Sequence, residues 1–202
     1  AAADLSIYSD SLAADWSDWS WVVTKNLGNA APAHSGSGSV AVTLTAGWSA
    51  FYLHPNTPVN TASYDQIRFW VHGGSSGGQK LQLVANGSQT YSFTTSANAW
   101  TLVSVPLSAL GSPANLTDIY WQDSSGGAQA TFYLDDISLV QRPLAPTADL
   151  PIYTEALGDS WADWSWSSSR NFANTSPIHG GANSLAVTLT GAWGALYLHT
   201  DS

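Results

Sequence analysis

The chain has 202 residues and a formal net charge of −9, with five lysines and arginines against fourteen aspartates and glutamates. This balance argues against nucleic acid and anionic membrane surfaces as partners, because both are bound by clustered cations. The absence of cysteine excludes disulfide bonds, zinc–thiolate centres and thiol nucleophiles, and no apolar run is long enough for insertion into a membrane.

The chain begins with AAAD rather than with methionine. Such a start is typical of a secreted protein whose signal peptide has been removed, so we expect an extracellular location. The first conspicuous motif is WSDWSW at residues 16–21, in which three of six positions are tryptophan. We expect Trp21 to support the fold and Trp16 or Trp19 to be exposed.

Short segments of alternating polarity follow this motif. In residues 39–45, Val40, Val42 and Leu44 share one face, and the same period of two recurs along the chain as far as residue 140. This period is typical of β-strands with one buried face, and Gly, Pro, Ser and Asn mark the turns between them. The sequence therefore predicts an all-β fold, an antiparallel two-sheet β-sandwich (jelly roll).

Two consecutive predicted strands, residues 48–54 and 66–72, carry aromatic and hydrogen-bonding side chains on the faces directed away from the core. If these strands pair, the side chains form one platform suited to sugars. The C–H faces of a sugar ring stack on aromatic rings, and its hydroxyls bond polar side chains. The predicted carbohydrate-binding residues are Trp19, Trp48, Tyr52, His54, Arg68, Trp70, His72, Gln82, Trp121 and Gln122.

The alternative interpretation of this strip is structural. A loop or the second sheet would then cover the rings, and the tryptophans would belong to the core, as they often do in β-sandwiches. The sequence leaves both interpretations open.

The chain contains an internal repeat. The stretch DLSIYSDSLAADWSDWSW from Asp4 matches DLPIYTEALGDSWADWSW from Asp149, and the match continues without a gap to His54 and His199. We expect a complete module at residues 1–142, a Pro-containing linker at 143–148, and an incomplete second copy at 149–202 that matches residues 4–57. The second copy belongs to a longer protein, pairs with a neighbouring molecule, or exchanges places with the front of the first copy.

The ends of the complete module resemble a known class of proteins. The stretches IYSDSL, AHSGSGSVAV and TFYLDDISLV resemble secreted carbohydrate-binding modules of the β-jelly-roll type that are appended to polysaccharide-degrading enzymes. The resemblance covers residues 4–142 and, for the front part, 149–202. It implies two antiparallel sheets, and glycan binding without catalysis on a sheet face or at the loop tips.

The resemblance also implies a structural calcium ion between the first strand, a loop and the last strand. The matching positions are Asp10, Ser37 through its backbone oxygen, and Asp135 or Asp136. Such carboxylates and carbonyls suit Ca²⁺, which takes roughly six to eight oxygen ligands. Where similar modules often carry Glu, this chain has Ser9, followed by Asp10. The sequence therefore leaves open which position supplies the first calcium ligand. Alternatively, the two final aspartates simply end an edge strand.

Catalytic patterns are missing from the sequence. Glycoside hydrolysis needs two carboxylates that face each other across a cleft, and no such pair lies among the predicted platform residues. We therefore expect a non-enzymatic protein that binds a neutral polysaccharide or cell-wall glycan. The alternative is a structural subunit of an extracellular fibre, sheath or surface layer, which would self-associate by strand complementation through residues 149–202.

Overall fold

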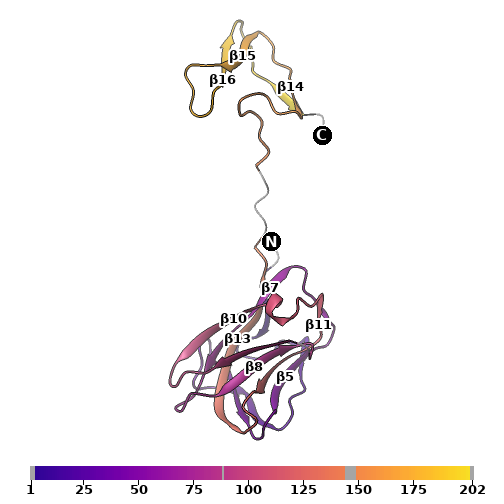
Figure 1. Cartoon of the computed structure of the whole chain (residues 1–202). Helices are drawn as coiled ribbons and strands as arrows, with labels where there is room; N and C mark the ends of the chain where they lie inside the picture. Colours follow the sequence, from indigo (N-terminus) through magenta and orange to yellow (C-terminus); the bar gives the residue numbers. More distant parts are fainter. Residues whose placement is uncertain (1–2, 88, 144–148, 201–202) are drawn as a thin grey trace. The chain divides into compact units, whose positions relative to one another are not determined.

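The computed structural model describes residues 3–87, 89–143 and 149–200 and divides the chain into two compact units, Ala1–Pro143 and Leu144–Ser202, called unit 1 and unit 2 (Figure 1). The division falls at the predicted linker 143–148, of which residues 144–148 lie outside the described part of the chain. Among the described residues, no helix has the length and apolarity that crossing a membrane requires.

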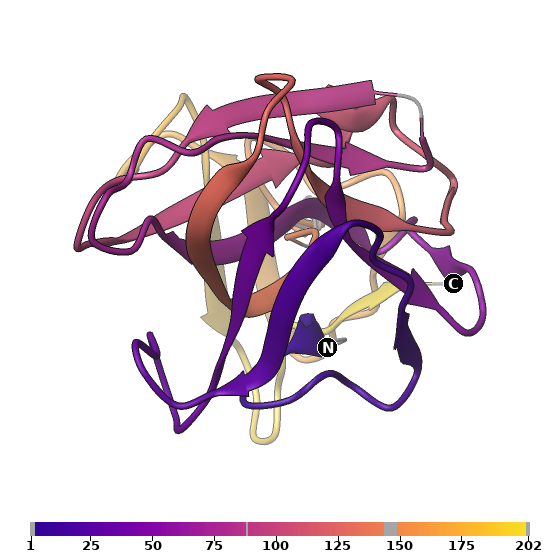
Figure 2. The same ribbon diagram turned by 90° about the horizontal axis from the view of Figure 1, so that it is seen from below.

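Unit 1 consists of two antiparallel sheets. Sheet A has the strand order β10–β7–β13–β4–β3, and β1 also pairs with β13. Figure 2 shows β3 and β4 as neighbouring indigo and purple arrows. The strands of sheet A are β1 (Leu5–Tyr8), β3 (Val23–Asn29), β4 (Ser39–Leu44), β7 (Tyr64–His72), β10 (Trp100–Pro106) and β13 (Gln129–Gln141).

Sheet B lies opposite, with the strand order β2–β5–β12–β8–β9. A short pair of strands, β6 with β11, and a single 3-10 turn, η1 (Leu107–Leu110), complete the unit. The remaining strands of unit 1 are β2 (Trp16–Asp18), β5 (Ala50–Pro55), β6 (Val59–Asn60), β8 (Lys80–Ala85), β9 (Gln89–Thr94), β11 (Asn115–Leu116) and β12 (Ile119–Asp123).

The core lies between the two sheets and is built from the apolar faces that alternation predicts. Val42 on β4 and Phe69 on β7 bury their side chains from sheet A, while Phe51 on β5 and Leu83 on β8 do so from sheet B. Burial of side chains of this size stabilises a fold by roughly 1.5–3 kcal/mol each. The predicted antiparallel two-sheet sandwich is thus confirmed.

The predicted pairing of strands 48–54 and 66–72 is wrong. β5 lies in sheet B between β2 and β12, and β7 lies in sheet A between β10 and β13. The chain crosses from one layer to the other through the segment that contains β6. Both strands direct their apolar residues, such as Leu53 and Ile67, into the same core. Their other faces therefore point away from each other, on opposite sides of the sandwich.

Unit 2 contains four strands that match β2, β3, β4 and β5 of unit 1 and that pair in the same way. Its sheets are β14–β17 and β15–β16, with Trp161 opposite Thr200, as Trp16 lies opposite Pro55 in unit 1. Leu189 is exposed, whereas its counterpart Leu44 is buried. Self-association through this unit stays a prediction. The strands are β14 (Trp161–Asp163), β15 (Ser168–Asn174), β16 (Ser184–Leu189) and β17 (Leu198–Thr200).

Candidate functional site

The outer face of sheet B carries a group of aromatic rings. Tyr52 on β5 lies directly opposite Tyr120 on β12, and their rings stack with centroids 5.3 Å apart. Because side chains alternate along a strand, both residues point away from the core that Phe51 and Trp121 fill. The aromatic face, as the group is called below, consists of Trp19, Trp21, Trp48, Tyr52, His54 and Tyr120.

The motif at residues 16–21 divides its tryptophans between the core and this face. Trp16 is only 5% exposed, whereas Trp19 is 59% exposed. The Trp19 indole lies on the His54 imidazole, with centroids 4.0 Å apart and planes 8° from parallel. It is also nearly parallel to the Tyr52 ring, at 6.3 Å and 11°. Of Trp16 and Trp19, one of which the sequence predicts to be exposed, Trp19 is the open ring, and the two stacked neighbours fix its orientation.

A small polar network holds this segment on β5. The Asp18 carboxylate accepts hydrogen bonds from the backbone N–H and the hydroxyl of Ser20, at 3.0 and 2.5 Å, and pairs with Lys25 at 2.6 Å. The backbone N–H of Tyr52 donates to the Ser20 hydroxyl oxygen at 3.0 Å. Burial opposes ionisation of Asp18, but the Lys25 and Ser20 contacts outweigh it and lower the carboxyl's pKa. The charge beside the aromatic face is therefore neutralised locally.

Trp48 occupies a turn at the edge of the aromatic face and is 58% exposed. Its φ of 61° lies in the left-handed region, which is unfavourable for a bulky residue and persists only where neighbours enforce it. Its carbonyl oxygen accepts hydrogen bonds from the Trp21 indole N–H at 3.1 Å and from the Gln122 amide at 2.9 Å. These contacts join Trp21 and Gln122 to the turn at one backbone oxygen.

Asp123 fixes the same turn from beneath. Its buried carboxylate accepts hydrogen bonds from the backbone N–H groups of Trp48, Ser125 and Gly126, at 3.0, 3.0 and 2.8 Å, and from the Gln129 amide at 2.7 Å. Burial by itself would raise the carboxyl's pKa, but these donors hold it well below its ordinary value. Sequence reasoning missed Asp123. Its position after YWQ at the end of an alternating strand gave no sign of what it binds.

The structure assigns Trp21 to both roles that the sequence weighed. Its ring contacts Tyr52 and Tyr120 at centroid distances of 5.7 and 5.5 Å, and its indole N–H supports Trp48. With 37% of its surface exposed, it nevertheless belongs to the open face. The sequence offers Tyr120, with Trp121 and Gln122, as an extension of the platform that depends on which face of their strand points outward, and the structure turns Tyr120 outward.

Hydrogen-bonding groups border the rings. Gln82 donates to Gln122 at 2.7 Å, across the pairing of β8 with β12. Burial, with the nearby Asp118 carboxylate, raises the pKa of both the Tyr52 and Tyr120 hydroxyls. A phenol of ordinary pKa is already protonated at neutral pH, so both hydroxyls are polar groups of the kind that hydrogen-bond a ligand's oxygen atoms.

Trp121 does not belong to the site. It is fully buried and packs edge-on against Phe69, with centroids 5.2 Å apart. Since adjacent residues of a strand point to opposite faces, Trp121 and Gln122 cannot both contact a surface ligand. Gln122 faces outward, and Trp121 is part of the core.

The residues predicted from strand 66–72 form a separate cluster on the outer face of sheet A. The His34 imidazole stacks on the Trp70 indole, with centroids 3.8 Å apart. His72 contacts Trp100 and Tyr133 at 5.3 and 5.8 Å. Burial lowers the pKa of His72. Because His34 covers one face of Trp70, this arrangement fastens the loop before β4 to the sheet.

Arg68 is also engaged locally. Its guanidinium pairs with the Asp4 carboxylate at 2.9 Å. With Trp70 and the exposed Leu102 it lines a shallow hollow of about 470 Å³ on sheet A. Arg68, Trp70 and His72 are therefore not brought together with Trp48, Tyr52 and His54.

The predicted calcium ligands are occupied by hydrogen-bond donors. Asp135, which is fully buried, accepts from the backbone N–H groups of His34 and Ser35 at 2.8 and 3.3 Å. Asp10 accepts from the N–H groups of Ser37 and of Gly38. A calcium ion between these carboxylates and the loop would need backbone oxygen atoms from the loop as further ligands. The loop instead directs its backbone N–H groups at the carboxylates.

Asp136 binds the same loop through its side chain. One carboxylate oxygen contacts the His34 imidazole at 2.8 Å, and the other accepts from the Ser35 hydroxyl at 2.8 Å. Within the described part of the chain, no three acidic or histidine side chains gather where a metal would bind. The residues as arranged do not fit Ca²⁺, and the predicted ion stays a prediction.

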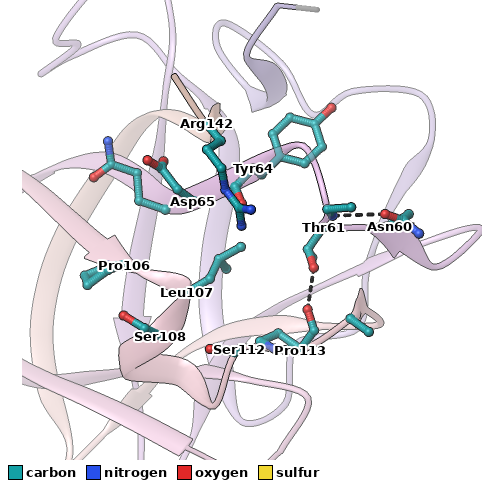
Figure 3. A pocket seen from close by; sticks show the side chains of 13 residues that line it. Asn60, Thr61, Tyr64, Asp65, Pro106, Leu107, Ser108, Ser112, Pro113 and Arg142 are labelled. Atoms are coloured by element: carbon teal, nitrogen blue, oxygen red, sulfur yellow. Dashed lines mark hydrogen bonds between the residues drawn. The ribbon is translucent and has the colours of Figure 1, made fainter. Parts of the chain in front are cut away.

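A pocket of about 590 Å³ lies away from the aromatic face, near the end of β13 (Figure 3). Arg142 donates to the Tyr64 carbonyl at 3.3 Å there, and the Thr61 hydroxyl donates to the Pro113 carbonyl. Tyr64 is the one aromatic residue among its lining side chains. The pocket therefore lacks the stacked rings that distinguish the aromatic face.

Comparison with known proteins places unit 1 in a family. The family model described as the expansin-like protein C-terminal domain matches residues 7–142. An endoglucanase of Dictyostelium discoideum is 31% identical over 146 residues, which cover 66% of this chain and 20% of that protein. The chain thus spans about a fifth of the length of this curated relative.

Solved structures show the same fold. A family 11 carbohydrate-binding module of the cellulosomal cellulase Lic26A-Cel5E of Clostridium thermocellum aligns with a TM-score of 0.52 at 14% identity, covering 73% of this chain and 99% of that one. Variants of CBM29-2, a family 29 carbohydrate-binding module, complexed with mannohexaose and with cellulohexaose, align with TM-scores of 0.50 at 14% identity. They cover 69% and 67% of this chain and 92% and 89% of theirs. The predicted resemblance to carbohydrate-binding modules is therefore confirmed for the fold.

Proposed function

Because this chain belongs, through residues 7–142, to the family of expansin-like protein C-terminal domains, we propose that unit 1 binds a neutral polysaccharide without cleaving it, outside the cell. The ligand class is an uncharged hexose polymer. The observation that carries the proposal is the aromatic face of sheet B, on which Trp19 and Trp48 leave more than half of their surfaces open.

The chemistry of the aromatic face fits a sugar chain. Open indole rings offer apolar surfaces to the C–H faces of pyranose rings. The Tyr52 and Tyr120 hydroxyls and the Gln82–Gln122 amide pair lie among or beside these rings and suit the sugar's hydroxyl edges. The ion pair of Asp18 with Lys25 leaves little net charge in this region. A polyanionic glycan would in addition meet a chain whose formal net charge is −9.

The relatives agree with this ligand class. The similar family 29 modules were solved with mannohexaose and cellulohexaose, and the curated relative is an endoglucanase. In a larger enzyme of that kind, a module such as unit 1 would hold the polymer close to the catalytic domain. Such anchoring requires only binding, which is all that the aromatic face supplies.

Titration of the full chain with cellulohexaose and mannohexaose tests the proposal. We expect tryptophan fluorescence to change on binding, and Trp19→Ala and Trp48→Ala each to lower the affinity at least tenfold, which corresponds to about 1.4 kcal/mol. The matched control is Leu102→Ala, which removes an exposed apolar side chain from sheet A and should bind as the wild type does.

Two outcomes would contradict the proposal. One is the absence of binding at millimolar concentrations of either hexasaccharide. The other is loss of binding in Trp70→Ala but not in Trp19→Ala, which would move the site to the opposite sheet.

A further inference from the structure

We propose that unit 2 carries a second glycan-binding face and that the chain therefore holds one polysaccharide molecule at two places. This inference rests on the function proposed for unit 1, because the second face is recognised by its likeness to the first. The residues of the second face are Trp164, Trp166, Trp193, Tyr197 and His199.

The internal repeat retains every aromatic residue that its matched stretch contributes to the aromatic face. Trp19, Trp21, Trp48, Tyr52 and His54 have identical counterparts in the same order and at the same spacing. Some core positions differ between the copies. For example, leucine occupies the positions in unit 2 that match Val40 and Phe51.

The same pairs of rings meet in unit 2, although Trp164 meets Tyr197 edge-on, at 74°, where Trp19 lies nearly parallel to Tyr52, at 11°. The Trp164 indole stacks on the His199 imidazole with centroids 3.9 Å apart and planes 23° from parallel. Trp193 has a φ of 62°, and its carbonyl oxygen accepts a hydrogen bond from the Trp166 indole N–H at 2.8 Å. Tyr197 lies against both Trp164 and Trp166. Each of these contacts has its equivalent in unit 1.

The supporting polar network is repeated as well. Asp163 accepts from the backbone N–H of Ser165 at 3.0 Å and pairs with Arg170 at 2.7 Å, as Asp18 does with Ser20 and Lys25. The backbone N–H of Tyr197 donates to the Ser165 hydroxyl oxygen at 2.8 Å. The segment that carries Trp164 and Trp166 is therefore held beside Tyr197 by specific contacts within unit 2.

The tryptophans of this face are open to solvent even in a complete module. In unit 1, where both sheets are complete, Trp19 and Trp48 remain open to solvent. Trp193, the counterpart of Trp48, is 93% exposed. Leu189 differs, because its counterpart Leu44 is buried in unit 1. The counterparts of Trp164, Trp166 and Trp193 thus stay exposed in the complete module, whereas those of Tyr197 and His199 are half-buried there.

The described residues of the second face include no equivalent of the groups that β8 and β12 supply to the first. Among the described residues of unit 2, none corresponds to Gln82, Tyr120 or Gln122, because the repeat matches only residues 4–57 of unit 1. We therefore expect weaker binding of a short oligosaccharide at unit 2. On a long polymer this weakness matters less, because the second contact becomes intramolecular once unit 1 is bound, and such linkage strengthens binding by roughly 10²–10⁴.

The experiment compares the wild-type 202-residue chain with its double variant Trp164→Ala, Trp193→Ala, using cellulohexaose, mannohexaose and a soluble glucomannan. We expect two hexasaccharide sites per wild-type chain and one per variant chain, and an affinity for the glucomannan that falls at least tenfold in the variant. Ile178→Ala, which removes an exposed apolar side chain of unit 2, should behave as the wild type does. Trp164→Phe should retain most of the binding, which shows that the loss does not come from unfolding.

The inference is overturned if the double variant binds glucomannan within twofold of the wild type, or if the wild type has a single hexasaccharide site that only Trp19→Ala removes. These results would leave the function of unit 1 intact. A wild-type chain that binds none of the three glycans would instead refute both proposals.

Discussion

The Trp19 indole and the His54 imidazole stack almost in parallel, 4.0 Å apart, although the two residues come from different strands. The stack sets the orientation of the open indole, because His54 is anchored on β5 while Trp19 follows the short strand β2. The same pairing in unit 2, between Trp164 and His199 at 3.9 Å, shows that the arrangement recurs wherever the motif occurs in this chain.

Removing the supporting ring should weaken binding without removing the indole. We expect His54→Ala to lower the affinity for a hexasaccharide roughly threefold to tenfold, since an aromatic pair contributes about 0.5–1.5 kcal/mol, and His54→Phe to restore most of it. Isothermal titration measures the effect. His72→Ala on sheet A is the control, and an equal loss in both alanine variants would disprove the assigned role.

Asp123→Asn should loosen the turn that presents Trp48. An amide nitrogen cannot accept the backbone N–H groups that one carboxylate oxygen now accepts, so a buried donor loses its partner at a cost on the order of 1–3 kcal/mol. We expect the free energy of unfolding in urea to fall by this amount and glycan affinity to fall with it. The exposed Asp4→Asn change, which breaks a surface ion pair with Arg68, should cost less than about 1 kcal/mol.

The contribution of Asp123 should depend on pH in a defined direction. Its pKa is lowered in the folded state relative to about 3.9 for an unfolded chain, so the folded state binds fewer protons around that pH. The stabilisation is present above about pH 4 and is lost as the pH falls towards the folded value. The stability difference between wild type and Asp123→Asn should therefore shrink between pH 7 and pH 3; a constant difference would argue against the mechanism.

Trp121 should behave as a core residue and not as a contact for sugar. Trp121→Phe leaves unfilled volume beside Phe51 and Phe69, and we expect it to lower the free energy of unfolding by about 1–3 kcal/mol. Hexasaccharide affinity should stay within twofold of the wild type when measured well below the melting temperature. A large loss of hexasaccharide affinity in a stably folded Trp121→Phe variant would show that Trp121 contributes to the binding site.

Calcium removal tests the ion that family resemblance implies. Because the Asp10 and Asp135 carboxylates are bound by backbone N–H groups, we expect the melting temperature to be the same in excess EDTA and in millimolar Ca²⁺. A ligand that binds only the folded state raises the melting temperature. A rise of several degrees with Ca²⁺ would therefore show that the loop rearranges to present oxygen atoms.

Much of the architecture was predictable because strand periodicity is a local property. Alternation in residues 39–45 and 66–72 identified Val42 and Phe69 as core residues, and both are buried. The repeat also identified the matching segments of unit 2. Alternation further implied that Trp121 and Gln122 point to opposite faces, but it did not say which of the two faces the core.

The composition of the site was harder to predict. Trp48 and Trp70 belong to neighbouring predicted strands, but they lie on opposite sides of the sandwich, because β5, which follows Trp48, and β7 belong to different sheets. Asp123 could not be found, since its role depends on backbone donors from Trp48, which lies far away in sequence. Contacts between residues so far apart in sequence can be identified only when the order of the strands in the sheets is known.

The sequence alone determined that this chain folds as β-strands with one apolar face each, in a module whose front part is repeated, because side-chain periodicity follows from backbone geometry. The tertiary structure alone decided which outward-facing rings meet. The order of the strands depends on how the two sheets together bury their apolar faces. This order places the Tyr52 ring beside the Tyr120 ring and the Trp70 ring beneath the His34 imidazole.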